Sequence, residues 1–176
     1  MKLLKASLGI IVIVVIVGFT GLKFFYLKGP VAVHEGQLKM PQLTAPVNVY
    51  TDEYGVPHVY AENEEDLFFA VGYLQASERL YKMDIIARAV EGRLAEAFGP
   101  DLIEDDKYLR TWGFHRIAQN VSKSMSAENR KLLGRSLEGI NAYIDEHSDD
   151  LPVEFKIAGH EPIHWTYNHI IGYARL

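Results

Sequence analysis

The chain has 176 residues, of which 48% are hydrophobic, and a formal net charge of -5. This composition excludes wholesale disorder, and the negative charge argues against a nucleic-acid partner, because such proteins present a basic face. The absence of cysteine excludes disulfides, thiolate metal sites and a cysteine nucleophile in this chain. The charge is unevenly distributed, since the first 30 residues carry four lysines and no acid, which leaves the rest of the chain strongly acidic.

The first 28 residues are predicted to form a signal anchor. Ala6 to Leu22 contains no charge, and the apolar run continues past Lys23 to Leu27. A helix of about 22 residues at ~1.5 Å per residue would span roughly 33 Å, enough for a bilayer core. Bulky residues from Phe24 to Leu27 stand where a signal peptidase site would need small ones, so we expect an uncleaved transmembrane helix through residues 6–27. A cleaved signal peptide remains the alternative, and either places the body outside the cytoplasm, on the periplasmic side of the inner membrane.

Residues 29–46 contain three prolines and two glycines and no helical periodicity, which predicts an extended linker. The body, residues 47–176, begins with two alternating stretches, 47–50 and 56–60, on either side of a turn that ends at Gly55. This pattern predicts a β-hairpin.

The remaining pattern is helical. Asn63 is a predicted N-cap, and three- and four-residue spacing predicts one long helix, or two with a break, over residues 64–98, ended by Gly99 and Pro100. Short helices or loops follow over 101–122. Ser126 is the predicted N-cap of a helix that ends near His147, and a last segment begins at Trp165. One hairpin cannot cover the long apolar face of Leu67, Phe68, Leu80, Met83 and Leu94, so we expect further chain to cover it.

His160 to His164 matches the H-E-x-x-H string of zinc peptidases, with His169 as a candidate third ligand. Pro162 lies inside the string and would break the helix that aligns the two imidazoles, so we predict an exposed loop and no metal site.

Other polar residues give no catalytic constellation. His58 is a candidate general base, but a strand histidine paired with a neighbouring strand is the more ordinary interpretation. The serines at 122, 124 and 126 lack a nucleophile elbow, and capping explains Ser126. Helix-face ion pairs, some of them buried, are expected among the carboxylates and arginines Glu53, Asp84, Glu91, Glu96, Arg79, Arg88 and Arg93.

From the hairpin onward the sequence resembles the α region of the penicillin acylase family. The resemblance rests on the joint order of several strings over roughly residues 46–170: Asp52 to Ala61, Leu67 to Tyr73, Ala76 to Asp84, Gly92 to Gly99, Leu109 to Thr111, Leu137 to Ile144, Leu151 to Phe155, Gly159, Glu161-Pro162 and Trp165-Thr166. Tyr167, Asn168 and His169 depart from the family, in which proline and aspartate commonly follow the Trp-Thr pair. Ser77 stands where relatives often have glutamine.

The resemblance implies an α+β fold: a mainly helical fragment with an N-terminal β-hairpin, part of a four-layer αββα N-terminal-nucleophile hydrolase. Such enzymes are zymogens that cut themselves into α and β subunits. The new N-terminal residue, usually serine, attacks an amide carbonyl with its own α-amine as base. We therefore expect no catalytic residue and no metal ligand in this chain, a nucleophile after Leu176, and a β-subunit from the same precursor as partner. No cofactor is implied, apart from a structural calcium ion held by some complete members.

The acyl donor stays open among penicillins, cephalosporins, acyl-homoserine lactones and lipopeptides. Two other functions remain as alternatives: a membrane-anchored, non-catalytic binding or scaffold protein and, third, a zinc peptidase acting through His160 and His164.

Overall fold

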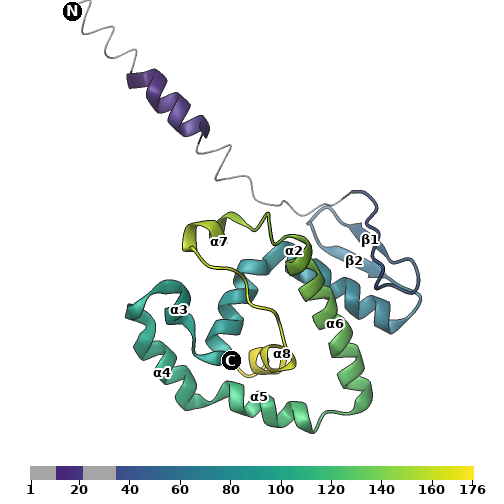
Figure 1. Cartoon of the computed structure of the whole chain (residues 1–176). Helices are drawn as coiled ribbons and strands as arrows, with labels where there is room; N and C mark the ends of the chain where they lie inside the picture. The colour runs from purple at the N-terminus through teal and green to yellow at the C-terminus, as the bar shows by residue number, and fades with distance from the viewer. Residues whose placement is uncertain (1–10, 22–34) are drawn as a thin grey trace, which may run out of the picture.

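The computed structural model describes residues 11–21 and 35–176, and the labels below follow Figure 1. Among these residues, the elements after position 34 are β1 (Asn48–Thr51), β2 (Pro57–Tyr60), α2 (Glu64–Glu91), α3 (Leu94–Phe98), η1 (Pro100–Leu102), α4 (Ile103–Trp112), α5 (Phe114–Lys123), α6 (Ala127–Glu146), α7 (Val153–Ala158) and α8 (Tyr167–Tyr173). The predicted fold class, mainly helical with one N-terminal hairpin, is confirmed.

The leader is described only in part. Residues 11–21 form a helix, and the rest of the predicted anchor lies outside the described residues. Within the described ranges, no helix combines the length and apolar character needed to cross a membrane. Residues 35–46 are irregular, and the backbone N–H groups of Thr44 and Ala45 donate to the carboxylate of Asp66 at 3.1 and 2.9 Å. The last part of the predicted linker is thus fastened to the start of α2.

The hairpin forms where the sequence predicts it. Strands β1 and β2 pair antiparallel, with Asn48 opposite Tyr60 and Thr51 opposite Pro57. Gly55 has a φ of 78°, which an L side chain rarely adopts, and Pro57 occupies the first position of its strand. Asp52 accepts hydrogen bonds from the N–H groups of Tyr54 and Val56 and so closes the turn.

Helix α2 is the longest described element. The Asn63 side chain accepts from the N–H of Asp66, as the predicted N-cap should, and Gly92 ends the helix with a φ of 63°. The backbone leaves helical geometry at Arg79, so α2 is kinked. The predicted region 64–98 is therefore a kinked helix followed by the short helix α3.

The core lies mainly between α2 and α6, which cross closely in Figure 1. The predicted cap Ser126 and the end at His147 are confirmed for α6. Leu80 and Met83 are buried in the cluster that includes Ile140 and Ile144 of α6. The expectation that this apolar face lacks a cover within the chain is wrong for these two residues, because α6 supplies the cover.

Two glycines make the α2–α6 approach possible. A Cβ at Gly139 would lie 2.0 Å from the carbonyl oxygen of Phe69, and a Cβ at Gly72 would lie 2.1 Å from that of Ser136. Neither glycine can be replaced even by alanine unless the backbone of the facing helix moves. The two helices therefore touch through their main chains at this crossing.

Candidate functional site

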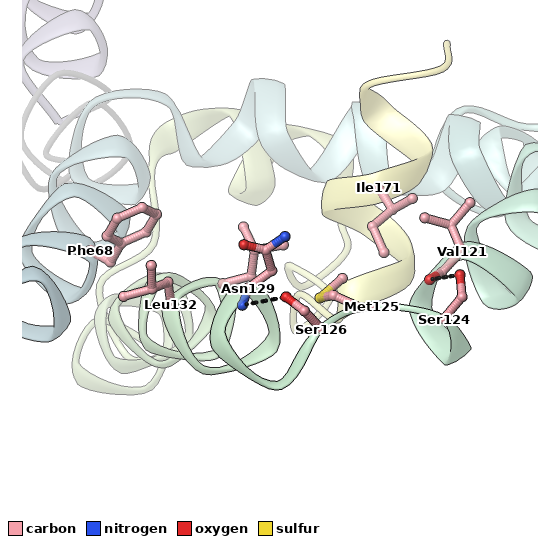
Figure 2. Close-up of a pocket in the computed structure, with 9 residues that line it drawn as sticks. Phe68, Val121, Ser124, Met125, Ser126, Asn129, Leu132 and Ile171 are labelled. Atoms are coloured by element: carbon pink, nitrogen blue, oxygen red, sulfur yellow. Dashed lines mark hydrogen bonds between the residues drawn. The ribbon is translucent and has the colours of Figure 1, made fainter.

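An apolar cleft lies where the beginning of α2 approaches α6, the α5–α6 connection and α8 (Figure 2). It has a volume of about 520 Å³, within the range of small-molecule pockets. Its walls are Phe68, Val121, Ser124, Met125, Ser126, Asn129, Leu132, Leu133 and Ile171. Most of these side chains are apolar, so the cleft suits an apolar group.

The hydroxyl groups of the cleft are engaged locally. Ser124 donates to the carbonyl oxygen of Val121 at 3.0 Å, and the Ser126 oxygen accepts the N–H of Asn129 at 3.2 Å, as the dashed lines in Figure 2 show. The described walls include no histidine or carboxylate. The cleft can therefore bind but holds no pair of nucleophile and base.

His58 pairs with the carboxylate of Asp52 at 3.1 Å, within its own hairpin. The hydrogen bond from the backbone N–H of Val56 is the main cause that lowers the pKa of Asp52 below its usual value, and the bond with the His58 side chain is the second. The His58 side chain is half exposed and lies apart from the cleft lining. This arrangement agrees with a histidine that holds a turn in place.

The H-E-x-x-H string is not helical, since residues 159–166 carry no helix. The His160 ring stacks on Tyr81, whereas His164 pairs with Asp145 at 2.8 Å. Among the residues that the structure describes, no group of three or more potential ligands could hold a metal ion. The prediction of an exposed loop is right for His164 but wrong for His160, whose side chain is only 12% exposed.

A buried charge network holds the segment that contains His160. Asp84 and Arg88 form the expected ion pair one helical turn apart, with 2.7 Å between Nε and Oδ2 and both side chains nearly inaccessible. Asp84 also accepts the N–H of Ile163 at 2.9 Å, and Arg88 donates to the carbonyl oxygen of Glu161 at 3.0 Å. This pair of side chains thus fixes the irregular connection between α7 and α8.

A second network sits at the C-terminal end of α2. Glu91 accepts from Arg93 at 2.6 Å and is bonded to His169 at 2.9 Å, and Arg93 also reaches Glu96. Burial works to raise the pKa of Glu91, but the bonds from His169 and Arg93 outweigh it and lower that pKa. The expected partners of Arg88 and Arg93 are confirmed, whereas Arg79 is exposed at the kink.

Sequence reasoning missed the cleft and the role of Asp66. Asp66 is fully buried, and hydrogen bonds led by the Thr44 side chain hold its pKa well below the usual value. In the sequence, Asp66 lies in the first turn of a predicted helix, where acidic residues are common, so its position alone does not mark it as special. The signal that distinguishes it, a partner 22 residues away, is not local.

Comparison with known proteins gives one consistent result. The family model for penicillin amidase matches residues 46–176. Penicillin acylase 2 proenzyme from Pseudomonas sp. (strain SE83) is 34% identical over 140 residues, which cover 80% of this chain and 18% of that protein. Penicillin G acylase from Escherichia coli is 31% identical over 128 residues, covering 70% of this chain and 15% of that protein.

An acyl-homoserine lactone acylase from Pseudomonas fluorescens (strain Pf0-1) is 26% identical over 150 residues, covering 85% of this chain and 18% of that protein. The solved structure of a thermostable penicillin G acylase from Alcaligenes faecalis matches with a TM-score of 0.66 and 27% identity, over 73% of this chain and 69% of that chain. This chain thus spans less than a fifth of the length of the curated relatives described above.

Proposed function

This chain belongs to the penicillin amidase family, and we propose that it is the front, α-subunit part of a self-processing hydrolase. The reaction would cleave a linear amide bond and release a carboxylic acid and an amine. The proposal rests on two matches that agree: the family model matches residues 46–176, and the backbone of this chain matches that of a penicillin acylase with a TM-score of 0.66. The complete protein would have the four-layer αββα architecture.

In this proposal the nucleophile lies after Leu176 and is exposed by cleavage of the precursor. Its hydroxyl would attack the amide carbonyl while its own α-amine takes the proton and passes it to the leaving amine. Water would then attack the acyl-enzyme ester, release the acid and restore the hydroxyl. Backbone or side-chain donors of the β-subunit would stabilise the tetrahedral intermediate.

The described residues would contribute a frame and a binding surface to this chemistry. The α2–α6 core is closely packed where the two main chains approach each other, and its buried charges bind the irregular segments around it. The apolar cleft beside α8 offers walls for an apolar group. The names of the relatives include two classes of substrate, penicillins and acyl-homoserine lactones, and the acyl donor of this protein would belong to one of these classes.

We also propose that residues 6–27 anchor the protein in the inner membrane with its body on the periplasmic side. The support is the uncharged run from Ala6 to Leu22 and the lack of a small-residue cleavage site after it. Export after signal cleavage is the competing arrangement. Membrane fractionation separates the two, because an anchored protein stays with the membranes in carbonate washes and a cleaved one does not.

Mass spectrometry of the purified full-length protein tests self-processing. We expect two chains, with a serine, threonine or cysteine at the new N-terminus. Replacing that residue with alanine should abolish both cleavage and amide hydrolysis, whereas the matched control Ser148→Ala, at an exposed serine that donates to the carbonyl oxygen of Asp145, should change neither. A single uncut chain, with no release of amine from penicillin, cephalosporin or acyl-homoserine lactone substrates, would contradict the proposal.

A further inference from the structure

His169 closes the N-terminal end of α8 in an unusual way. Its Nδ1 accepts the backbone N–H of Thr166 at 3.1 Å, while the Thr166 side chain accepts the backbone N–H of His169. This reciprocal arrangement is a capping box, in which glutamate or glutamine ordinarily occupies the position of His169. The side chain that completes this cap is therefore an imidazole, whose Nδ1 can either accept a hydrogen bond or carry a proton.

The hydrogen bonds fix the tautomer of the ring. Because Nδ1 accepts from a backbone N–H, it carries no hydrogen, and the single hydrogen of the neutral ring sits on Nε2. Nε2 lies 2.9 Å from Oε1 of Glu91 and so donates to that carboxylate. The neutral ring thus links α8 to the end of α2 while it caps α8, and the residue is only 3% exposed.

The charges around the ring come from several elements. On α2, Glu91 contacts it directly and also pairs with Arg93 at 2.6 Å, and this one guanidinium is shared with Glu96 of α3. In the described structure, His169 forms no hydrogen bond or ion pair with the other charged or titratable groups of the neighbouring segments: His115, Arg116 and Lys123 of α5, Arg130 of α6, which lies over the Tyr167 ring, and Arg175 after α8.

We propose that His169 is a pH-sensitive latch, whose neutral ring docks α8 on α2 and whose protonation at Nδ1 releases it. The added proton turns the acceptor of the cap into a donor that points at the Thr166 N–H, so the two repel and the cap opens.

Release of α8 alters the candidate site. Ile171 of α8 forms part of the cleft wall, and Gly172 sits so close to Val90 that a Cβ there would lie 2.3 Å from its Cγ1. Movement of α8 away from α2 therefore removes one wall of the cleft. Acidification should open the cleft, and neutral pH should close it.

Trp165 provides the measurement. It is 6% exposed, its ring lies edge-on to His169 with 5.9 Å between centroids, and Trp112 is the only other tryptophan in the sequence. In a Trp112→Phe background, acrylamide quenching reports the accessibility of Trp165, and dividing the Stern–Volmer constant by the lifetime without acrylamide gives a bimolecular quenching constant that is free of quenching by the imidazolium. Between pH 8 and pH 5 we expect the quenching constant to rise at least about twofold, with a one-proton midpoint, as a buried tryptophan becomes solvated.

Matched variants identify the group. His169→Asn keeps an acceptor where Nδ1 stands but cannot be protonated, so its quenching constant should stay flat over this range. His164→Asn removes the neighbouring exposed histidine and should keep the transition. Glu91 stays ionised in this window because its pKa is lowered. A flat profile in the Trp112→Phe protein, or a transition that persists in His169→Asn, overturns the proposal.

Nitrogen-15 NMR of the imidazoles gives a second test that needs no variant at position 169. At pH 8 the His169 ring must show a bare Nδ1 and a protonated Nε2. The opposite tautomer, or a ring still doubly protonated at pH 8, would overturn the latch even if His169→Asn fails to fold.

Discussion

Among the glycines of the described structure, Gly139 is the one where an added Cβ would lie closest to a backbone atom, so we expect a large effect from a single added methyl group. Gly139→Ala would place Cβ 2.0 Å from the carbonyl oxygen of Phe69 and 2.8 Å from the backbone nitrogen of Tyr73. Ordinary contact begins near 3.4 Å, so α2 and α6 would have to separate by roughly 1.4 Å. Both partners are backbone atoms of α2, which cannot rotate away as a side chain can.

The magnitude follows from two opposing effects. Overpacking of this kind costs about 3 kcal/mol, the upper part of the usual range, because backbone must move. Alanine gains about 1 kcal/mol over glycine in a helix interior. The net loss of unfolding free energy is therefore about 2 kcal/mol, which corresponds to a fall of roughly 6–10 °C in Tm for a domain of this size.

Circular dichroism melts of Gly139→Ala and Gly134→Ala provide the assay. A Cβ at Gly134, in the same helix, would meet the far end of the Tyr167 side chain, with the hydroxyl oxygen at 2.7 Å and Cζ at 3.8 Å, and this side chain can shift. We expect Gly134→Ala to stay within about 0.5 kcal/mol of the parent protein. A Tm for Gly139→Ala equal to or above that of Gly134→Ala would refute the direct main-chain contact between α2 and α6.

Three further predictions concern polar groups. Arg88→Met leaves Asp84 buried without its ion partner and should lower the unfolding free energy, measured by urea titration, by about 3–5 kcal/mol. Adding Asp84→Asn should recover part of this loss, and a cost of Arg88→Met below about 1 kcal/mol would contradict the buried pair. The lowered pKa of Glu91 means that its contribution is fully present above its unfolded value of 4.5 and is lost as the pH falls through the folded value, so Glu91→Gln should flatten the loss of stability below pH 4.5. An unchanged slope there would rule out this contribution. Ser126→Ala should cost about 1 kcal/mol through loss of the α6 cap, against no more than about 0.5 kcal/mol for the exposed Ser148→Ala; equal losses would argue against the cap.

Local features of the fold were predictable from the sequence. The caps Asn63 and Ser126 act on backbone only three residues away, and the Asp84–Arg88 pair joins positions one helical turn apart. Their geometry follows from helix periodicity alone. The hairpin likewise depends on a turn that the sequence marks with Gly55.

Long-range contacts were not predictable in the same way. The bond from Ile163 to Asp84 spans 79 residues, and the contact of His169 with Glu91 spans 78. His160 is mostly shielded from solvent because Tyr81 and Arg88 contact it across the fold, which no local pattern encodes. The apolar face of α2 was recognised from its spacing, but only the structure shows that α6 covers its middle.

The candidate site shows the same division. The resemblance to the acylases leads to the family, whereas the cleft is assembled from four separated parts of the chain, 68, 121–126, 129–133 and 171. Its apolar walls had no signal in the sequence beyond ordinary amphipathic spacing. The departure at His169 was visible as a change of residue type, but its bonds to Thr166 and Glu91 were not.

The buried carboxylates share one task. Asp66 binds the backbone of Thr44 and Ala45, Asp84 binds that of Ile163, and Asp106 of α4 accepts the N–H groups of Leu94 and Ala95 at 2.7 and 2.8 Å. Each ties a segment boundary or an irregular segment to a helix, and two of the three sit on α2. Their oxygens accept hydrogen bonds from these backbone N–H groups and, in Asp66 and Asp84, from side chains as well. The polar interior of this chain therefore positions backbone, which is the contribution expected of a part whose nucleophile is proposed to lie elsewhere in the polypeptide.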